Sequence, residues 1–165
     1  MKNENRKVVT LGLVIRGKQI LLGMKKRGFG KGYWNGFGGK LHENESLMDG
    51  MRRELQEETT LLMNHGEKVA FLEFFFESGM ILEGHVFRIE DFSGTPSETE
   101  EMRPVWYSFS EIPYHSMWED DIFWLPHVLD KKNVVAQFSF SSDHKLLGKN
   151  IEIVPDKKFY EICKK

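Results

Sequence analysis

The sequence predicts an α+β fold in which a mixed β-sheet is sandwiched between α-helices. The chain has 165 residues, of which 40% are hydrophobic, enough for one domain with a packed core. Apolar runs with strand-like spacing dominate, and two segments with helical spacing interrupt them. No internal repeat, low-complexity tract or linker divides the chain, so we expect residues 1–165 to form a single domain.

The first helix has the clearest local signals. Ser46 followed by Asp49 resembles a capping box, and an apolar residue recurs every four positions from Leu47. The segment before it, 27–40, holds six glycines, which permit tight turns and close backbone approach to a ligand. In chain order we expect a β-hairpin at 7–15 and 18–24, the loop at 27–40, a helix at 46–59, strands at 68–77, 81–90 and 103–109, a helix near 121–131, and strands at 133–141 and 150–154.

Composition excludes several classes of function. The formal net charge of −2 argues against binding a nucleic-acid polymer through a basic surface. The single cysteine, Cys163, excludes a disulfide framework within the chain and a cysteine-based zinc site, and fits a reducing compartment. No apolar run reaches the roughly 20 residues of a membrane span. We therefore expect a soluble, cytoplasmic protein with no membrane partner. A monomer is the expected oligomeric state, although composition does not determine it.

Three glutamates on the first helix point to a cation. Glu54, Glu57 and Glu58 share an arc of roughly 100° beside the buried stripe of the helix. Each pair at about 5–6 Å repels by roughly 1 kcal/mol in water. A solvated acidic face is the alternative. The glycine turn upstream can add carbonyl oxygens, and an oxygen-only ligand set favours Mg²⁺ or Mn²⁺, completed by substrate phosphates.

The residues around this helix match a family pattern. The Nudix box, G-x5-E-x7-R-E-U-x-E-E-x-G-U, is matched at every position but one by Gly39, Glu45, the run 53–58 and Leu61. The chain thus resembles the Nudix hydrolases, with the box at 39–61, and the resemblance implies the Nudix fold. Thr60 stands where the family has glycine, which suits a left-handed helix end. Threonine in that conformation would cost about 1 kcal/mol.

The resemblance also implies roles for the box residues. Glu45 and Arg53 would tie the loop to the helix. Glu54, Glu57 and Glu58 would bind the metal. The carbonyl of Gly38 and the carboxylate of Glu101 would join them, although by sequence alone "ETEEMRP" is an exposed loop. The family's cofactor is Mg²⁺, with Mn²⁺ as a substitute.

A wider resemblance implies a substrate. The stretches "LLGMKKRGFGKGYWNGFGGK", "EEMRP" and "MWEDDIFW" are similar to those of Nudix hydrolases that act on oxidised purine nucleoside triphosphates, such as 8-oxo-dGTP and 2-hydroxy-dATP. The likeness runs from about Thr10 to Phe140. It implies that the chain cleanses the nucleotide pool by releasing pyrophosphate and a monophosphate. The mitochondrial and nuclear pools are alternatives to the cytoplasmic one.

The motif "MWEDDIFW" offers groups that could recognise a purine. Trp118 presents a stacking face, and Asp120 and Asp121 would meet the polar edge of the base. Two adjacent carboxyls can share a proton, so the pair suits both an oxidised guanine and an oxidised adenine. The structural alternative is that either aspartate caps the following helix. Asn35 is either a base contact or a turn residue before glycine.

Other positions are expected at the ligand through the resemblance. Phe74 and Phe76 share one face of their strand, which by spacing alone indicates only core. Lys25 could equally be a solvated lysine. The expected substrate-binding set is completed by Thr10, Leu11, Phe29, Phe37, Gly38, Gly39, Lys40 and Met102.

The expected reaction is hydrolysis at the β-phosphorus, an assignment made by resemblance alone. A bound cation neutralises phosphate oxygens and lowers the pKa of a water molecule. Glu58 is the first choice for the general base and Glu101 the second. One rival is a pyrophosphohydrolase for another nucleoside diphosphate derivative, and another is a catalytically silent nucleotide-binding module. An isomerase on the same fold is a remote third. No zinc-hydrolase or P-loop motif is present.

Overall fold

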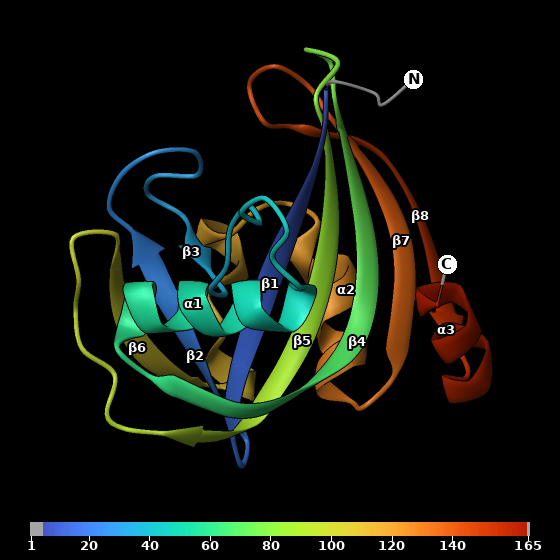
Figure 1. The fold of residues 1–165 in the computed structure, drawn as a ribbon. Helices are drawn as coiled ribbons and strands as arrows, with labels where there is room; N and C mark the ends of the chain where they lie inside the picture. The colour runs from blue at the N-terminus through green and yellow to red at the C-terminus, as the bar shows by residue number, and fades with distance from the viewer. Residues whose placement is uncertain (1–4, 165) are drawn as a thin grey trace.

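A computed structural model describes residues 5–164, which form eight strands and three α-helices (Figure 1). The strands are β1 (Arg6–Arg16), β2 (Gln19–Lys25), β3 (Trp34–Asn35), β4 (Leu62–Phe76), β5 (Ile81–Ser93), β6 (Met102–Ser108), β7 (Asn133–Phe140) and β8 (Leu146–Val154). The helices are α1 (Leu47–Thr59), α2 (Asp121–Leu129) and α3 (Asp156–Cys163).

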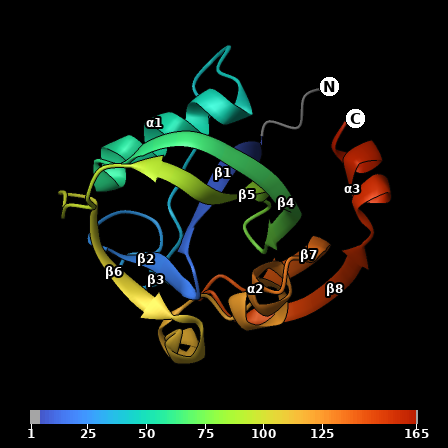
Figure 2. The ribbon, with the colours of Figure 1, turned by 90° about the horizontal axis from the view of Figure 1, so that it is seen from below.

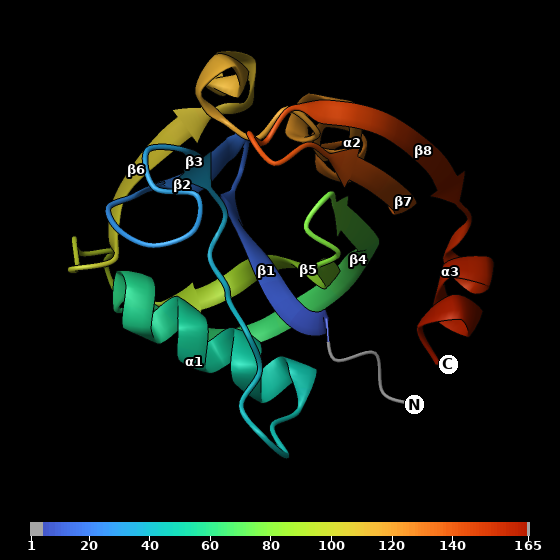
Figure 3. The same cartoon turned by 90° about the horizontal axis from the view of Figure 1, so that it is seen from above.

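The strands form one mixed sheet. Its order is β3-β2-β1-β5-β4-β7-β8, and β6 also pairs with β2. The pairs β1–β5 and β4–β7 are parallel, whereas the other pairs are antiparallel. Viewed from below and from above, α1 and α2 cover opposite faces of the central strands (Figures 2 and 3). The predicted fold class, a mixed sheet between helices, is confirmed.

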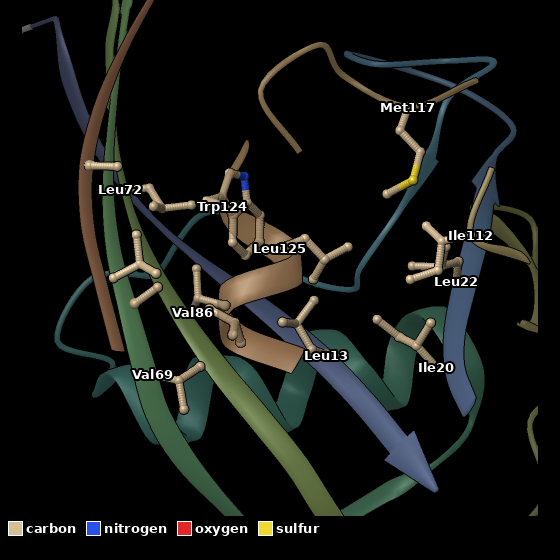
Figure 4. Close-up of a cluster of buried hydrophobic side chains, with 14 of the residues drawn as sticks. Leu13, Ile20, Leu22, Val69, Leu72, Val86, Ile112, Met117, Trp124 and Leu125 are labelled. Atoms are coloured by element: carbon tan, nitrogen blue, oxygen red, sulfur yellow. The ribbon is translucent and has the colours of Figure 1, made fainter. Parts of the chain in front are cut away.

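Two apolar clusters hold these layers together. Between the sheet and α2 lie Leu13, Val86 and Trp124, each at most 1% exposed (Figure 4). Under α1, Met51 and Leu55 are completely buried against the sheet. Burying one such side chain stabilises the fold by about 1.5–3 kcal/mol. The amphipathic spacing of α1 therefore fixes the helix that carries the three glutamates onto the sheet.

Several element boundaries differ from the sequence prediction. β4 begins at Leu62 rather than 68, because register shifts between 63 and 70 interrupt the period-two alternation. β8 begins at Leu146 rather than 150, and α3 was not predicted at all. The glycine-rich loop contains the short strand β3, which the sequence did not indicate. Within residues 5–164, none of the helices has both the length and the hydropathy to cross a bilayer.

Candidate active site

The N-terminus of α1 has the predicted cap. The hydroxyl of Ser46 accepts a hydrogen bond from the backbone N–H of Asp49 at 3.1 Å. At the other end Thr60 adopts the left-handed conformation, with φ 68°, and its N–H donates to the carbonyl of Gln56. The helix therefore ends as the family glycine would end it, with threonine bearing the strain.

Arg53 ties the loop to the helix. Its Nε and Nη2 donate to the two carboxylate oxygens of Glu45 at 2.7 and 2.8 Å, and Nη2 also donates to the Lys40 carbonyl at 3.1 Å. This bidentate pair lowers the pKa of Glu45 to about 2, with help from the backbone N–H of His42. The tie implied by the resemblance is confirmed.

Glycines let the loop approach both β1 and the acids of α1. A Cβ on Gly38 would lie 1.8 Å from the backbone oxygen of Thr10, and one on Gly39 would lie 2.7 Å from Glu54 Oε1. A side chain is excluded at Gly38 by the backbone of β1, whereas one at Gly39 would displace the carboxylate of Glu54. The backbone N–H of Gly38 donates to Glu58 Oε1 at 2.8 Å. The loop backbone therefore binds Glu58 directly and lies close against the carboxylate of Glu54.

Burial makes both of these acids weak. It raises the pKa of Glu58 to about 8, and the negative charges of Glu54 and Glu101 act in the same direction, whereas the Gly38 N–H opposes the shift. Burial also raises the pKa of Glu54, against the influence of Arg53. A bound cation would relieve this cost, and carboxylate and carbonyl oxygens are ligands for hard divalent ions. The residues fit such an ion.

Two other predicted ligands point elsewhere. The side chain of Glu57 is 55% exposed and pairs with Arg53 at 3.3 Å. Glu101 accepts a hydrogen bond from Arg27 Nε at 2.8 Å. Within residues 5–164, no three His, Cys, Asp or Glu side chains are gathered closely enough to hold an ion as they stand. A metal site that includes Glu57 or Glu101 requires these side chains to rotate, and their roles as ligands stay predictions.

A cavity of about 190 Å³ lies beside the loop. Most of its wall is apolar or aromatic, and five polar side chains from distant segments converge on it. Thirteen of the fifteen predicted substrate-binding residues line it: Thr10, Leu11, Lys25, Phe29, Asn35, Gly38, Gly39, Phe74, Phe76, Met102, Trp118, Asp120 and Asp121. Residues predicted from separate parts of the chain are therefore brought together at one site.

The aspartate pair forms the buried polar part of this cavity. Asp120 and Asp121 are 2% and 9% exposed. Asp120 stands at the N-cap position but makes no side-chain capping bond, because its carboxylate accepts instead from Trp124 Nε1 at 2.8 Å, and Asp121 is the first residue of α2. Burial raises the pKa of both carboxyls, and the charge of Asp120 raises that of Asp121 further. The hydroxyl of Thr10, also on the wall, has no hydrogen-bond partner among the described residues.

Two predicted substrate contacts do not line the cavity. Phe37 is completely buried in the cluster under α1, since its backbone pairs with Gly12 and its side chain faces the helix. Its side chain is not part of the cavity wall, and its role as a substrate-binding residue stays a prediction. Lys40 lies further along the loop, where its carbonyl accepts from Arg53. A side-chain hydrogen bond with Lys7 and the positive charge of Lys7 both lower the pKa of the Lys40 ammonium.

The sequence prediction missed part of the wall. Trp124 lies four residues after Asp120, and this spacing on a helix could have indicated their hydrogen bond. The remaining wall residues come mainly from strands whose neighbours the sequence does not reveal. They are Val9, Gly36, Leu72, Leu82, Gly84, Val86 and Phe140.

The fold and site define a class of protein: an α+β domain with an aromatic cavity beside a glycine-rich loop and an acidic helix. The chain belongs to the NUDIX family, whose domain model matches residues 5–128. Strands β7 and β8 and helix α3 lie beyond the matched part. Members of this family are hydrolases of nucleotide substrates and generally use a divalent metal ion.

Similar proteins support the assignment. The chain is 42% identical to the oxidized purine nucleoside triphosphate hydrolase of Mus musculus, over 90% of this chain and 96% of that protein. It is 40% identical to the protein of the same name from Danio rerio, over 91% and 97%. A crystal structure of a MutT protein from Bacillus halodurans superposes with a TM-score of 0.81 at 24% identity, covering 90% of this chain and 99% of the other. This last likeness concerns the fold alone.

Proposed function

We propose that this protein hydrolyses oxidised purine nucleoside triphosphates to monophosphate and pyrophosphate, with Mg²⁺ as its cofactor. The observation that carries the proposal is that one cavity is lined by the buried pair Asp120 and Asp121 and by two loop glycines, of which Gly38 binds Glu58 and Gly39 lies against Glu54. A purine ring at the aspartate pair and its phosphate chain at the glycine loop would span these two parts of the cavity. The names of the mouse and zebrafish relatives support the same substrate class.

The chain's own groups suit a modified purine. Trp118 offers an aromatic face at the wall of the cavity. The aspartate pair, sharing a proton, offers one donor and one acceptor to the edge of the base. Asn35 uses one amide N–H on the Tyr33 carbonyl at 2.9 Å, which leaves its oxygen and its second N–H for the ligand.

The phosphate end would be handled by the acidic helix. Glu54, Glu58 and the Gly38 carbonyl would hold the ion, with Glu57 and Glu101 reaching it after rotation. When bound, Mg²⁺ neutralises phosphate oxygens and lowers the pKa of a water molecule. Within residues 5–164 the second carboxylate oxygen of Glu58 has no hydrogen bond, because the Gly38 N–H binds only Oε1. It takes a proton from the water that attacks the β-phosphorus, and the monophosphate leaves.

A panel assay tests the proposal. Purified protein with Mg²⁺ is given 8-oxo-dGTP, 2-hydroxy-dATP, dGTP, dATP, CTP and ADP-ribose, and the release of pyrophosphate, of phosphate and of nucleoside monophosphate is measured separately. The proposal expects pyrophosphate from the oxidised purines, with kcat/KM at least about tenfold above the normal nucleotides. A preference for CTP or ADP-ribose would overturn it in favour of another pyrophosphohydrolase. Thermal stabilisation by nucleotide without any hydrolysis would establish a silent binding module.

A further inference from the structure

The turn between β7 and β8 is anchored beside the mouth of the cavity. Glu77, in the turn between β4 and β5, accepts hydrogen bonds from the backbone N–H and the hydroxyl of Ser142 at 2.8 and 2.9 Å. The backbone N–H of Ser141 donates to the Lys145 carbonyl at 2.9 Å and closes the turn. The two turns lie at the same end of the sheet (Figure 1). This turn lies outside the part of the chain that the family model matches.

His144 projects from this turn onto the cavity's aromatic wall. Its backbone has φ 64°, a left-handed conformation in which histidine is enriched. Its ring centroid lies 4.7 Å from that of Trp118, with the planes 39° apart, and 5.4 Å from that of Phe29. Both of these aromatic residues line the cavity. The imidazole itself is not part of the wall.

Trp118 depends on side-chain packing for its position. It lies in the segment just before α2, outside regular secondary structure. Its nearest aromatic neighbour is His144, since the centroids of Tyr33 and Phe29 lie 5.1 and 5.2 Å away. Phe29 is 47% exposed on the glycine-rich loop and gives less fixed support. The anchored turn therefore supplies the closest support for the indole.

We propose that His144 is a positioning residue for substrate binding: by packing on Trp118 it holds the indole where the base stacks. The inference rests on the proposed function. It assigns His144 no contact with the reacting phosphates, so its removal weakens binding of the base and leaves the chemical step intact. An aromatic pair contributes enough to change affinity by about two- to tenfold.

The test compares two replacements at the same position. His144→Asn removes the ring and keeps a residue that tolerates the left-handed conformation. His144→Phe keeps a ring and loses the polar nitrogens. His115→Ala is the matched control, because His115 is an exposed histidine of the segment 114–116 with no ring contact among the described residues. Values of kcat and KM are measured with 8-oxo-dGTP and Mg²⁺, and folding is checked by the melting temperature.

The expected result is a KM increase of about two- to tenfold in His144→Asn with kcat within about twofold of the wild type. His144→Phe should return KM to the wild-type range. In a Trp118→Ala background, His144→Asn should have no additional effect, because its partner is gone. An unchanged KM in His144→Asn, failure of phenylalanine to rescue, or a full effect without Trp118 would each overturn the inference.

Binding measurements separate this inference from the proposed function. If the wild type releases no pyrophosphate from any nucleotide, the proposed function fails. Nucleotide dissociation constants from calorimetry on the same variants then decide the role of His144. A larger Kd in His144→Asn, with a wild-type Kd in His144→Phe, supports the inference. Equal Kd values in the wild type and both variants, or no nucleotide binding to any of these proteins, overturn it.

Discussion

The carboxylate of Glu58 accepts a 2.8 Å hydrogen bond from the backbone N–H of Gly38, and Glu58 is only 5% exposed. The bond joins the C-terminal turn of α1 to the glycine loop, and the loop is pressed so closely on Thr10 that Gly38 has no room for a Cβ. A buried acid held in this way is positioned for chemistry at the cost of stability.

Replacing Glu58 with glutamine should separate activity from stability. Glu58→Gln removes the proposed base, so turnover should fall at least about 100-fold while nucleotide binding persists. Without divalent ions the variant should be more stable at pH 7, by up to about 3 kcal/mol, because glutamine does not have to take up a proton on folding as the weakened carboxyl of Glu58 does. The measurements are pyrophosphate release, calorimetric binding and urea denaturation. Glu43→Gln, an exposed neighbour in the loop, is the control. Near-normal turnover would remove Glu58 from the role of base.

The stability of the metal-free protein should fall as pH rises. Burial raises the folded-state pKa of Glu58 to about 8, above its unfolded value of 4.5. Such a group contributes stability that is complete below pH 4.5 and is lost as pH rises through 8. Asp120 and Asp121 act in the same direction. Melting temperatures in a chelator should therefore decrease from pH 5 to pH 8.

Adding Mg²⁺ should oppose this loss, since an ion binds the ionised carboxylates of the folded state. The gain in melting temperature should be larger at pH 8 than at pH 6. Monovalent salt at equal ionic strength controls for screening. A melting temperature that is independent of pH and unaffected by Mg²⁺ would contradict the assignment of Glu54 and Glu58 as weakened metal ligands.

The local parts of the site could be predicted from the sequence because fixed spacing determines them. On a helix, the residues at 53, 54 and 58 have defined directions, and the cap at Ser46 depends on a neighbour three residues away. The tie between Arg53 and Glu45 was implied by the family resemblance, and it too joins residues only eight positions apart. These features required no knowledge of how the strands pair.

The cavity wall and β4 depended on long-range pairing. Gly84 and Leu82 face the cavity because β5 lies parallel to β1 and antiparallel to β4, a register that strand spacing does not reveal. The bulges near Met63 hid the start of β4 for the same reason. The position of Phe37 was equally hidden, because a glycine-rich loop does not alternate its side chains as a strand does, and this side chain packs in the cluster under α1.

Restoring the family glycine at the end of α1 should stabilise the protein. Thr60 has φ 68°, where a β-branched residue is strained, so Thr60→Gly should add about 1 kcal/mol to the free energy of unfolding. The lost hydrogen bond from its hydroxyl to the Thr95 carbonyl is long, at 3.3 Å, and offsets little of this. Chemical denaturation measures the change. Thr60→Ala, which keeps a Cβ in the same conformation, should gain clearly less than glycine, and equal gains would show that the backbone strain is not the cause.

Finally, the aspartate pair should control discrimination between oxidised guanine and oxidised adenine. Burial raises the pKa of Asp120 and of Asp121, so the pair can keep a proton near neutral pH and present either a donor or an acceptor. Asparagine fixes its donor and acceptor and does not titrate in this range. We expect Asp120→Asn or Asp121→Asn to change the ratio of kcat/KM for 8-oxo-dGTP and 2-hydroxy-dATP by at least about tenfold. In a variant whose asparagine replaces the titrating carboxyl, this ratio should also change less with pH between 5 and 9. Glu119→Gln, an exposed acid next to the pair, is the control and should leave the ratio unchanged. If both asparagine variants keep the wild-type ratio at every pH, base selection does not depend on these carboxyls.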